Sequence, residues 1–244
     1  MNRLFTRTAV FIVVAVLIAA GLGYWQYREA RNNVFKTGTP LTASDAVSGE
    51  IPLLGADFSV DPLSKGWGHR TFLRYPPTDY SMTTIDGRRA LHCATHASAS
   101  ILARHTAIPV ADFRTLSWEW KIETPLTSNL DEATREGDDH PARFFVSFKS
   151  TEDTAHRAEI IWSNKRFQPG DYKDIEGFLH LVVNGHDENV GVWHAQSVDL
   201  MALYRKISGR TDNPVMDVLG FFCDSDNTGG QTSAYFADVV LKNK

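Results

Sequence analysis

Apolar and polar residues alternate with a period of two over much of the chain. Between residues 116 and 123 the apolar positions share one face of a predicted strand, and these are Leu116, Trp118, Trp120 and Ile122. Residues 143–149 and 235–241 alternate in the same way, and weaker strands are predicted at 71–75, 80–85, 88–96, 99–106, 158–163, 178–184, 192–198 and 217–223. Many short strands separated by turn sequences predict an all-β domain, specifically an antiparallel, jelly-roll-like β-sandwich.

A single stretch has helical spacing instead. Leu200, Leu203, Tyr204 and Ile207 recur every three to four residues. Asp199 is suited to cap the start of this helix, and Gly209 is suited to end it. We therefore expect one short connecting helix within the sandwich.

The N-terminal region has a different character. Residues 9–25 carry no charge, and as a helix these residues would extend about 25 Å, close to the thickness of a bilayer core. Arg3 and Arg7 precede the apolar run, which is typical of the side that stays in the cytoplasm. This pattern predicts a signal anchor over residues 1–27, that is, a single N-terminal transmembrane helix. Cleavage of the segment as a signal peptide is the alternative.

The predicted anchor sets the domain organisation and the location. Residues 28–50 are poor in large apolar groups and indicate a linker, and residues 51–244 hold the sandwich. We expect a single-pass protein of a bacterial inner membrane, with residues 28–244 in the periplasm. If the signal is cleaved, the protein is instead secreted to the periplasm.

Charge and motifs exclude several classes of function. The net charge is −4 although residues 1–31 are basic, so the remainder is acidic and disfavours binding of nucleic acid. The sequence holds no Gly-rich loop with a following lysine, which argues against a nucleotide ligand. Motifs of the common serine hydrolases and of zinc proteases are also missing from the sequence. Composition and motifs therefore favour a binding protein over a common type of enzyme.

Cys93 and Cys223 are the two cysteines of the chain, and each falls in a predicted strand. An exported protein can form a disulfide, but bonding requires the two Cα atoms to lie within about 7 Å. Two separate, buried thiols are the alternative, and the sequence leaves both possibilities open.

Two acidic turns are candidates for a ligand or metal site. Asp224, Asp226 and Asn227 follow an apolar strand, and oxygen ligands at this spacing suit a hard cation such as Ca²⁺. Asp138 and Asp139 form a second acidic turn before the strand that begins with Arg143. We expect the two turns to converge at one end of the sandwich. The carboxylates would then either hold a cation or pair with Arg143 in a structural clasp.

A set of short motifs resembles a known family. The set comprises Leu116-Ser117-Trp118-Glu119-Trp120-Lys121, Gly137-Asp138-Asp139 with Ala142-Arg143, Trp162, Trp193, Asp224-Ser225-Asp226-Asn227-Thr228, and Ala234-Tyr235-Phe236-Ala237-Asp238. It is similar to the bacterial exported family called domain of unknown function DUF3047, over about residues 53–242. The resemblance implies a galactose-binding-like sandwich and implies no activity.

Two functions remain from the sequence. The first is a membrane-anchored binding module for a glycan or another polar component of the cell envelope, with Trp162, Trp193, Asp138, Asp139 and Arg143 as ligand-binding residues. Surface tryptophans can stack on the faces of sugars, whereas Trp118 and Trp120 are predicted core residues. The second is a polysaccharide hydrolase or lyase, which needs suitably placed carboxylates. Binding is favoured, because no catalytic motif is recognisable.

Overall fold

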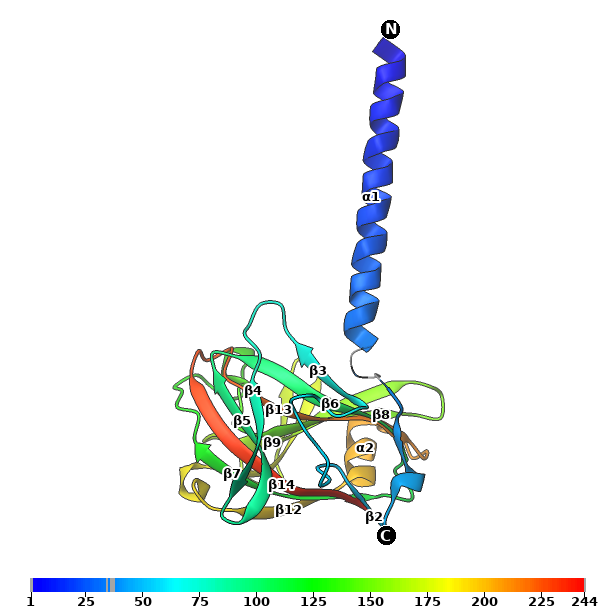
Figure 1. Cartoon of the computed structure of the whole chain (residues 1–244). Coiled ribbons are helices and arrows are strands. Elements are labelled where there is room, and N and C mark those ends of the chain that lie inside the picture. The colour runs from blue at the N-terminus through cyan, green and yellow to red at the C-terminus, as the bar shows by residue number, and fades with distance from the viewer. Residues whose placement is uncertain (1, 34, 36–37, 244) are drawn as a thin grey trace. The chain divides into compact units, whose positions relative to one another are not determined.

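The computed structural model describes residues 2–33, 35 and 38–243, and in the first helix it describes the side chains of residues 11–26. The chain forms two compact units, residues 1–34 and 35–244. The first contains α1 (Asn2–Asn33). The second contains fourteen strands, helix α2 and three short 3₁₀-helices among its described residues (Figure 1).

The strands of the second unit have the following bounds: β1 Leu41–Thr42, β2 Glu50–Pro52, β3 Trp67–Thr71, β4 Asp79–Ile85, β5 Arg88–His96, β6 Ala99–Pro109, β7 Thr115–Thr124, β8 Arg143–Lys149, β9 Ala155–Ser163, β10 Tyr172–Ile175, β11 Phe178–Gly185, β12 His194–Asp199, β13 Val215–Asp224 and β14 Gln231–Lys242. The helical elements are η2 Ala43–Asp45, η3 Arg135–Gly137, η4 Asp187–Asn189 and α2 Leu200–Ser208.

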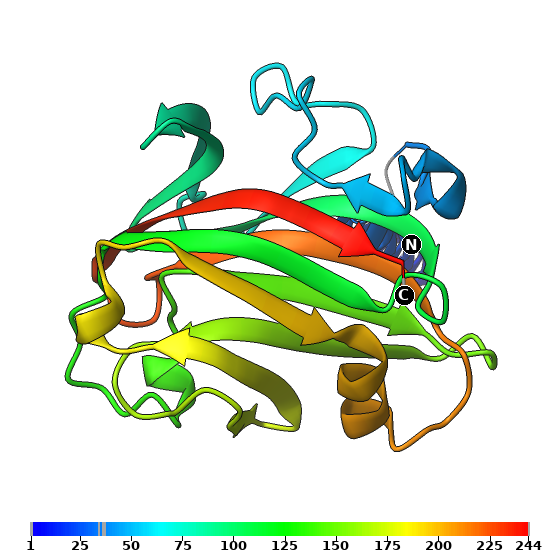
Figure 2. The ribbon, with the colours of Figure 1, turned by 90° about the horizontal axis from the view of Figure 1, so that it is seen from below.

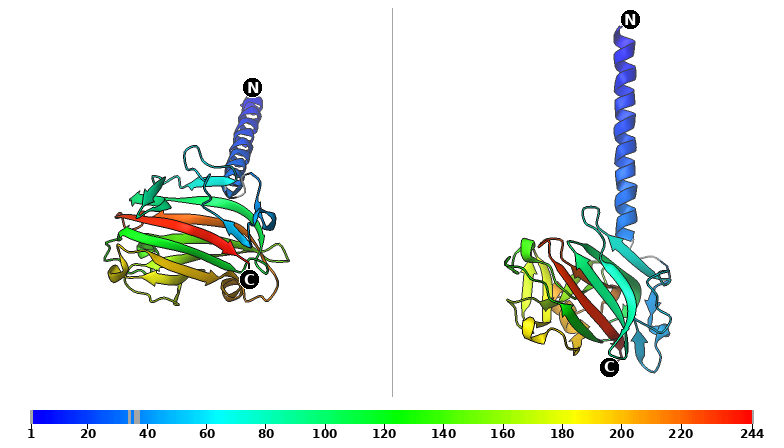
Figure 3. Two further views of the ribbon diagram at one scale, coloured as in Figure 1. Left: turned by 60° about the horizontal axis from the view of Figure 1, so that its bottom comes forward. Right: turned by 60° about the vertical axis from the view of Figure 1, so that its left-hand side comes forward.

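Two sheets form the sandwich. One has the order β1-β6-β13-β8-β9-β11-β10, with β3 also paired to β6; the other has the order β12-β7-β14-β5-β4, with β2 also paired to β14. Figures 2 and 3 show the two sheets as packed layers. Most neighbours are antiparallel, whereas β11 pairs with β9, and β1 with β6, in parallel. The prediction of an all-β sandwich is confirmed.

The core lies between the sheets and follows the predicted alternation. Trp118 and Trp120 on β7 are 2% and 0% exposed, and they pack against Phe144 of β8 with ring centroids 4.9 and 6.4 Å away. The prediction that both tryptophans belong to the core is confirmed. Because aromatic pairs at these distances add to the effect of buried area, this group is a major source of stability.

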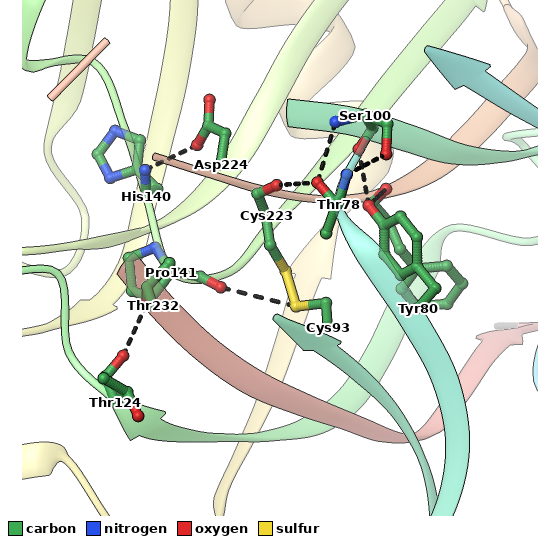
Figure 4. The surroundings of a disulfide bond; sticks show 11 residues. Thr78, Tyr80, Cys93, Ser100, Thr124, His140, Pro141, Cys223, Asp224 and Thr232 are labelled. Atoms are coloured by element: carbon green, nitrogen blue, oxygen red, sulfur yellow. Dashed lines mark hydrogen bonds between the residues drawn. A yellow bond between two sulfur atoms is a disulfide. The ribbon is translucent and has the colours of Figure 1, made fainter. Parts of the chain in front are cut away.

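A disulfide joins the two layers. Cys93 of β5 and Cys223 of β13 are bonded, with their Cα atoms 6.4 Å apart (Figure 4). Beside it, the Thr78 hydroxyl donates to the Cys223 carbonyl at 2.8 Å, and the Cys93 sulfur lies 3.9 Å from the Pro141 carbonyl. The structure thus decides between the two alternatives that the sequence left open.

Local signals account for the turns and for α2. The Asp199 side chain accepts a hydrogen bond from the Ala202 N–H, and Gly209 ends the helix in the left-handed conformation at φ 66°. Asp86 and Gly87 also have positive φ, 54° and 75°, which fits the two-residue turn of the β4–β5 hairpin. The predicted cap and stop of the helix are confirmed.

Two expectations differ from the structure. The strand predicted at 71–75 is displaced: β3 spans Trp67–Thr71, and residues 72–75 form a turn ahead of Pro76 and Pro77. The linker predicted over residues 28–50 overlaps α1, and residues 41–42 and 50 already pair with β6 and β14 of the sandwich. These pairings are made by main-chain groups, so the polar side chains of the segment gave no indication of them.

α1 contains the segment that the sequence predicted to cross a membrane. Among the residues with described side chains, no helix has an apolar stretch of sufficient length to span a bilayer. The structure therefore gives no support to the predicted transmembrane helix. Residues 1–10 and 27 of the predicted anchor lie outside those with described side chains.

Candidate functional site: a buried ionic cluster and an open groove

The two acidic turns meet at one end of the sandwich, as the sequence predicted. Asp139 accepts hydrogen bonds from the main-chain N–H groups of Asn227 at 3.2 Å and Thr228 at 2.6 Å. In return, the Asp224 carboxylate accepts from the His140 N–H at 2.9 Å. The cause is strand pairing, since the end of β13 lies opposite the start of β8. The convergence of the turns is therefore built into the sheet.

Arg143 lies at the centre of this meeting point. Its guanidinium pairs with Asp224 and with Glu159 of β9, the latter at 2.6 Å, and it lies 4.1 Å from the centroid of the Phe222 ring. It also donates to the Asp138 carbonyl at 3.2 Å. Its side chain is 3% exposed. Burial lowers the pKa of Arg143, but the neighbouring carboxylates of Glu159 and Asp138 outweigh this effect and raise it. The side chain therefore stays charged and holds the surrounding acidic groups together.

Several basic groups surround the Asp138 carboxylate. The Lys173 Nζ lies 2.5 Å from Asp138 Oδ1, while the Nε2 atoms of His140 and His180 lie at 3.5 and 3.6 Å. Burial raises the pKa of Asp138, but hydrogen bonding to His140 and the charge of Arg143 together outweigh it, and the pKa falls well below its usual range. Asp138 is thus held as the anion.

The hydrogen bonds of His140 fix its tautomer. Nδ1 faces the Trp162 carbonyl at 2.8 Å and must donate, whereas Nε2 lies 2.8 Å from Lys173 Nζ and must accept. Burial, followed by the charge of Lys173, lowers the pKa of His140 to about 4. His140 is therefore neutral at physiological pH. Its two ring nitrogens connect Lys173 to the Trp162 carbonyl of β9.

The loop between β7 and β8 covers this cluster. The Glu132 carboxylate accepts from the main-chain N–H groups of Asn164, Lys165 and Arg166, at 2.8, 3.1 and 3.0 Å. Gly137 is packed so closely that a Cβ there would lie 2.3 Å from the Asp131 carbonyl oxygen. The hydrogen bonds of Glu132 and the close packing of Gly137 therefore hold the loop in place.

Sequence reasoning placed Asp138, Asp139 and Arg143 in contact with a ligand, and the structure does not support this placement. Asp139 and Arg143 are 0% and 2% exposed, because the β7–β8 loop folds over them. Two basic residues of this cluster, His180 and Lys173, were not identified from the sequence. β10, which holds Lys173, was not predicted, so no signal marked its position. The cluster is best described as a structural clasp.

The predicted metal ligands form part of the same cluster. Carboxylate oxygens of Asp139, Asp224 and Asp226 lie within 4.8 Å of one another and could hold a cation. Burial and the neighbouring Asp139 raise the pKa of Asp226 to about 6. Three carboxylates suit Ca²⁺, but Asp224 already pairs with Arg143 and Asp139 already accepts two N–H groups. Asn227 contacts the group through its main-chain N–H, which donates to Asp139. The Ca²⁺ site stays a prediction.

The two tryptophans predicted to contact a ligand lie in different environments. Trp162 is 1% exposed and meets the Trp120 ring edge-on at 5.8 Å, so it belongs to the core and its prediction as a ligand-binding residue is wrong. The sequence did indicate this burial, because the apolar residues Ala158 and Ile160 lie on the same face of β9 as Trp162.

Trp193 precedes β12 and lies on the outer face of the six-stranded sheet, where it is half-buried. Its ring is 6.4 Å from that of Tyr235, and its Nε1 donates to Asp86 at 3.0 Å. The Arg88 guanidinium carbon lies 5.3 Å from the ring centroid. Trp193 is thus held in place while part of its ring remains accessible.

A groove of about 750 Å³ lies on this face, and Arg88, which packs over the Trp193 ring, is one of its lining residues. Its floor is formed by β7 and β14, where Ser117, Glu119 and Val240 point away from the core. Its walls are the segment from β2 to Ala56 and the turn that carries Arg88. Pockets of this size accept small molecules, and the lining is rich in polar groups. The groove is open to solvent and long enough for its side chains to meet a ligand of several rings.

Comparison with known proteins identifies the family of the chain. The family model described as "Protein of unknown function (DUF3047)" matches residues 65–240. None of the curated proteins matches the chain.

Three solved structures illustrate the similarity of shape. One is a non-crystalline cellulose specific carbohydrate-binding module, CBM28, at 11% identity, covering 81% of this chain and 94% of that chain with a TM-score of 0.41. Another is the xyloglucanase domain of NopAA, a type three effector from Sinorhizobium fredii, at 12% identity, 73% and 94% coverage and a TM-score of 0.39. The third is endoglucanase cel12A from Rhodothermus marinus, at 9% identity, 72% and 91% coverage and a TM-score of 0.38.

Proposed function

The chain belongs to the DUF3047 family of proteins of unknown function, and from this premise we propose that its sandwich binds a glycan, or a similar polyhydroxylated component of the cell envelope, in the open groove. The observation that carries the proposal is the half-buried Trp193 beside a polar groove on the outer face of a sheet. An aromatic ring covers the apolar face of a sugar, while nearby polar groups bind its hydroxyls.

The rigidity of the aromatic side chains supports this proposal. The Tyr235 hydroxyl donates to Glu123 at 2.6 Å, and His92 stacks on the Tyr235 ring with centroids 4.6 Å apart. Trp193 packs against this group and is hydrogen-bonded to Asp86. Side chains held in this way lose little conformational entropy on binding, which favours affinity.

Binding accounts for the groove better than hydrolysis does. A glycosidase needs one carboxyl that donates a proton and a second that acts as nucleophile or base. In the groove, the guanidinium of Arg88 pairs with Glu119 and lies 3.8 Å from Asp238, so both carboxylates share one cation. This arrangement suits hydrogen bonding to hydroxyls. A hydrolase or lyase remains the outcome that a turnover assay would detect.

We also propose that the sandwich is exported and anchored by its N-terminal segment in a bacterial inner membrane, with the binding domain in the periplasm. The uncharged run at residues 9–25 behind two arginines supports the proposal, and so does the disulfide, because disulfides persist in oxidising compartments. Protease protection in spheroplasts tests it, since only a periplasmic domain is digested from outside. Release at reduced mass would indicate cleavage of the signal.

Binding is tested by titrating the full-length chain with a panel of soluble polysaccharides in a calorimeter, together with an assay for released reducing ends. We expect retention of at least one glycan without release, and loss of binding in Trp193→Ala. Tyr24→Ala in α1 is the matched aromatic control, because it lies outside the sandwich. Sugar release would favour the enzyme, and binding that survives Trp193→Ala would contradict the groove as the site.

A further inference from the structure

We infer that the groove selects uncharged glycans and that Arg88, Glu119 and Asp238 form its hydroxyl-binding centre. This inference rests on the proposed function and names the class of glycan. It follows from the partners that each charged side chain of the groove already has, from the chemistry of the Arg88 cluster and from its position beside Trp193.

The charged side chains that line the groove are equal in number for the two signs, and each already has an ion-pair or hydrogen-bond partner. Arg88 contacts Glu119 and lies 3.8 Å from Asp238, and Lys242 lies 3.5 Å from Glu50. Arg89 donates to the Gly55 carbonyl at 2.9 Å, and also to the Phe58 carbonyl. These are the three basic and three acidic groups of the lining.

This pairing disfavours a charged ligand. To meet an opposite charge, a carboxylate or ammonium group on a sugar would have to compete with an existing ion pair or hydrogen bond of the lining. Hydroxyl groups carry no such penalty. They can donate to a carboxylate and accept from a guanidinium at the same time. Such charge-assisted hydrogen bonds are stronger than those between neutral groups.

The backbone places Asp238 for this role. The pairing of β14 with β7 is irregular between Ala237 and Val240, and Asp238 there has φ 50°, a left-handed value that is uncommon for residues other than glycine. Such a bulge redirects a side chain out of the regular alternation. The Asp238 side chain is 73% exposed next to Arg88. Its carboxylate is therefore available to a ligand while it remains close to a cation.

The extent of the groove favours an oligosaccharide over a single sugar. Its lining includes residues of β12, β7, β14 and β2, which lie side by side in the sheet. Three interstrand spacings cover about 14 Å. Arg88 lines this groove and also lies over the Trp193 ring, so it connects the polar centre to the aromatic ring. A chain of sugars could contact both.

The test compares three classes of soluble polysaccharide on the full-length chain: neutral, uronic acid-containing and amino sugar-containing. We expect calorimetric affinity for a neutral polymer at least about tenfold above that for the two charged classes. Arg88→Gln and Glu119→Gln should each weaken neutral binding about tenfold, which corresponds to the loss of one good charge-assisted interaction. Arg205→Gln, an exposed position on α2, is the control and should bind as the wild type does.

The outcomes separate this inference from the proposed function. If no polysaccharide binds, the proposed function fails. If a charged class binds more tightly than the neutral class, or if Arg88→Gln and Glu119→Gln both retain wild-type affinity while Trp193→Ala loses it, the inference is overturned and the proposed function stands. Because Arg88→Gln leaves Glu119 without its partner, the melting temperature of each variant is recorded. The more conservative Glu119→Gln decides if Arg88→Gln proves unstable.

Discussion

At the scale of single residues, Trp120 lies at the centre of the aromatic core. Its ring contacts those of Trp118, Phe144, Trp162 and Phe236, at centroid distances of 5.2 to 6.4 Å. These partners come from strands of both sheets, and the side chain is fully buried. A truncation here would leave a cavity bounded by rigid rings, which cannot collapse to fill it.

We therefore predict that Trp120→Ala lowers the free energy of unfolding by about 3–5 kcal/mol. Urea denaturation of the full chain measures the change. Trp193→Ala, at the accessible ring, is the matched comparison and should cost less than about 1 kcal/mol. Equal losses for the two variants would contradict the distinction between a core ring and a groove ring.

Protonation of Asp226 should have a measurable effect on the stability of the fold. Its pKa is raised from 3.8 to about 6, so between these values the folded state binds the proton more tightly than the unfolded chain. Stability from this group is present at low pH and is lost as the pH rises through about 6.

Asp226→Asn should therefore raise the melting temperature near pH 7 and change it little near pH 4. The measurement is a pH series of melting temperatures for both proteins with a chelator present. Asp131→Asn, an exposed carboxylate paired with Arg166, is the control and should not show a gain that grows with pH. A uniform shift at all pH values would indicate a packing effect instead.

At the scale of elements, the informative feature is the pairing of β8 with β13. Phe222 lies opposite Arg143 in this ladder, so the turn after β13 and the loop before β8 are brought together by main-chain hydrogen bonds. The carboxylates of Asp139, Asp224 and Asp226 are consequently close, although they are 85 residues or more apart between the two turns. Arg143 neutralises part of this charge, and a cation would neutralise more.

If the turns hold Ca²⁺, millimolar Ca²⁺ should raise the melting temperature and a chelator should reverse the rise, because a ligand of the native state stabilises by mass action. Asp226→Asn should abolish the response. Mg²⁺ at the same concentration controls for ionic strength. The absence of any shift with Ca²⁺ would leave Arg143 as the sole partner and reduce the site to the structural clasp.

At the scale of the whole molecule, the disulfide links the two sheets covalently, beside side-chain packing and the hydrogen bonds of the Tyr80 hydroxyl to β6 and β13. Cys93 and Cys223 lie 130 residues apart, so the bond closes a long loop of the unfolded chain. In the chain-entropy account, closing such a loop stabilises the native state by about 2–5 kcal/mol.

We expect the double variant Cys93→Ala, Cys223→Ala to lose about this amount in urea denaturation, and reduction of the wild type to give a similar loss. The double variant itself serves as the control for reduction, since a reductant should not affect it. A loss below about 1 kcal/mol would show that packing of the sheets alone determines stability.

The sequence by itself determined the class of fold, since alternation places Leu116, Trp118 and Trp120 on one face wherever the strand pairs. It also determined where helices begin and strands turn, as at the Asp199 cap and the Asp86-Gly87 turn, because these features depend on neighbours within a few residues. Part of the site was predictable for the same reason: each acidic turn follows or precedes a strongly apolar strand.

Only the tertiary structure decided which groups face each other across strands. Arg143 finds Glu159 because β8 pairs with β9, and Lys173 reaches Asp138 from a strand with no sequence signal. The groove likewise combines Arg88 with Asp238, which are 150 residues apart. Strand order and register depend on the summed packing of both sheets and on long-range main-chain bonds, and neither is encoded in the spacing of residues along one segment.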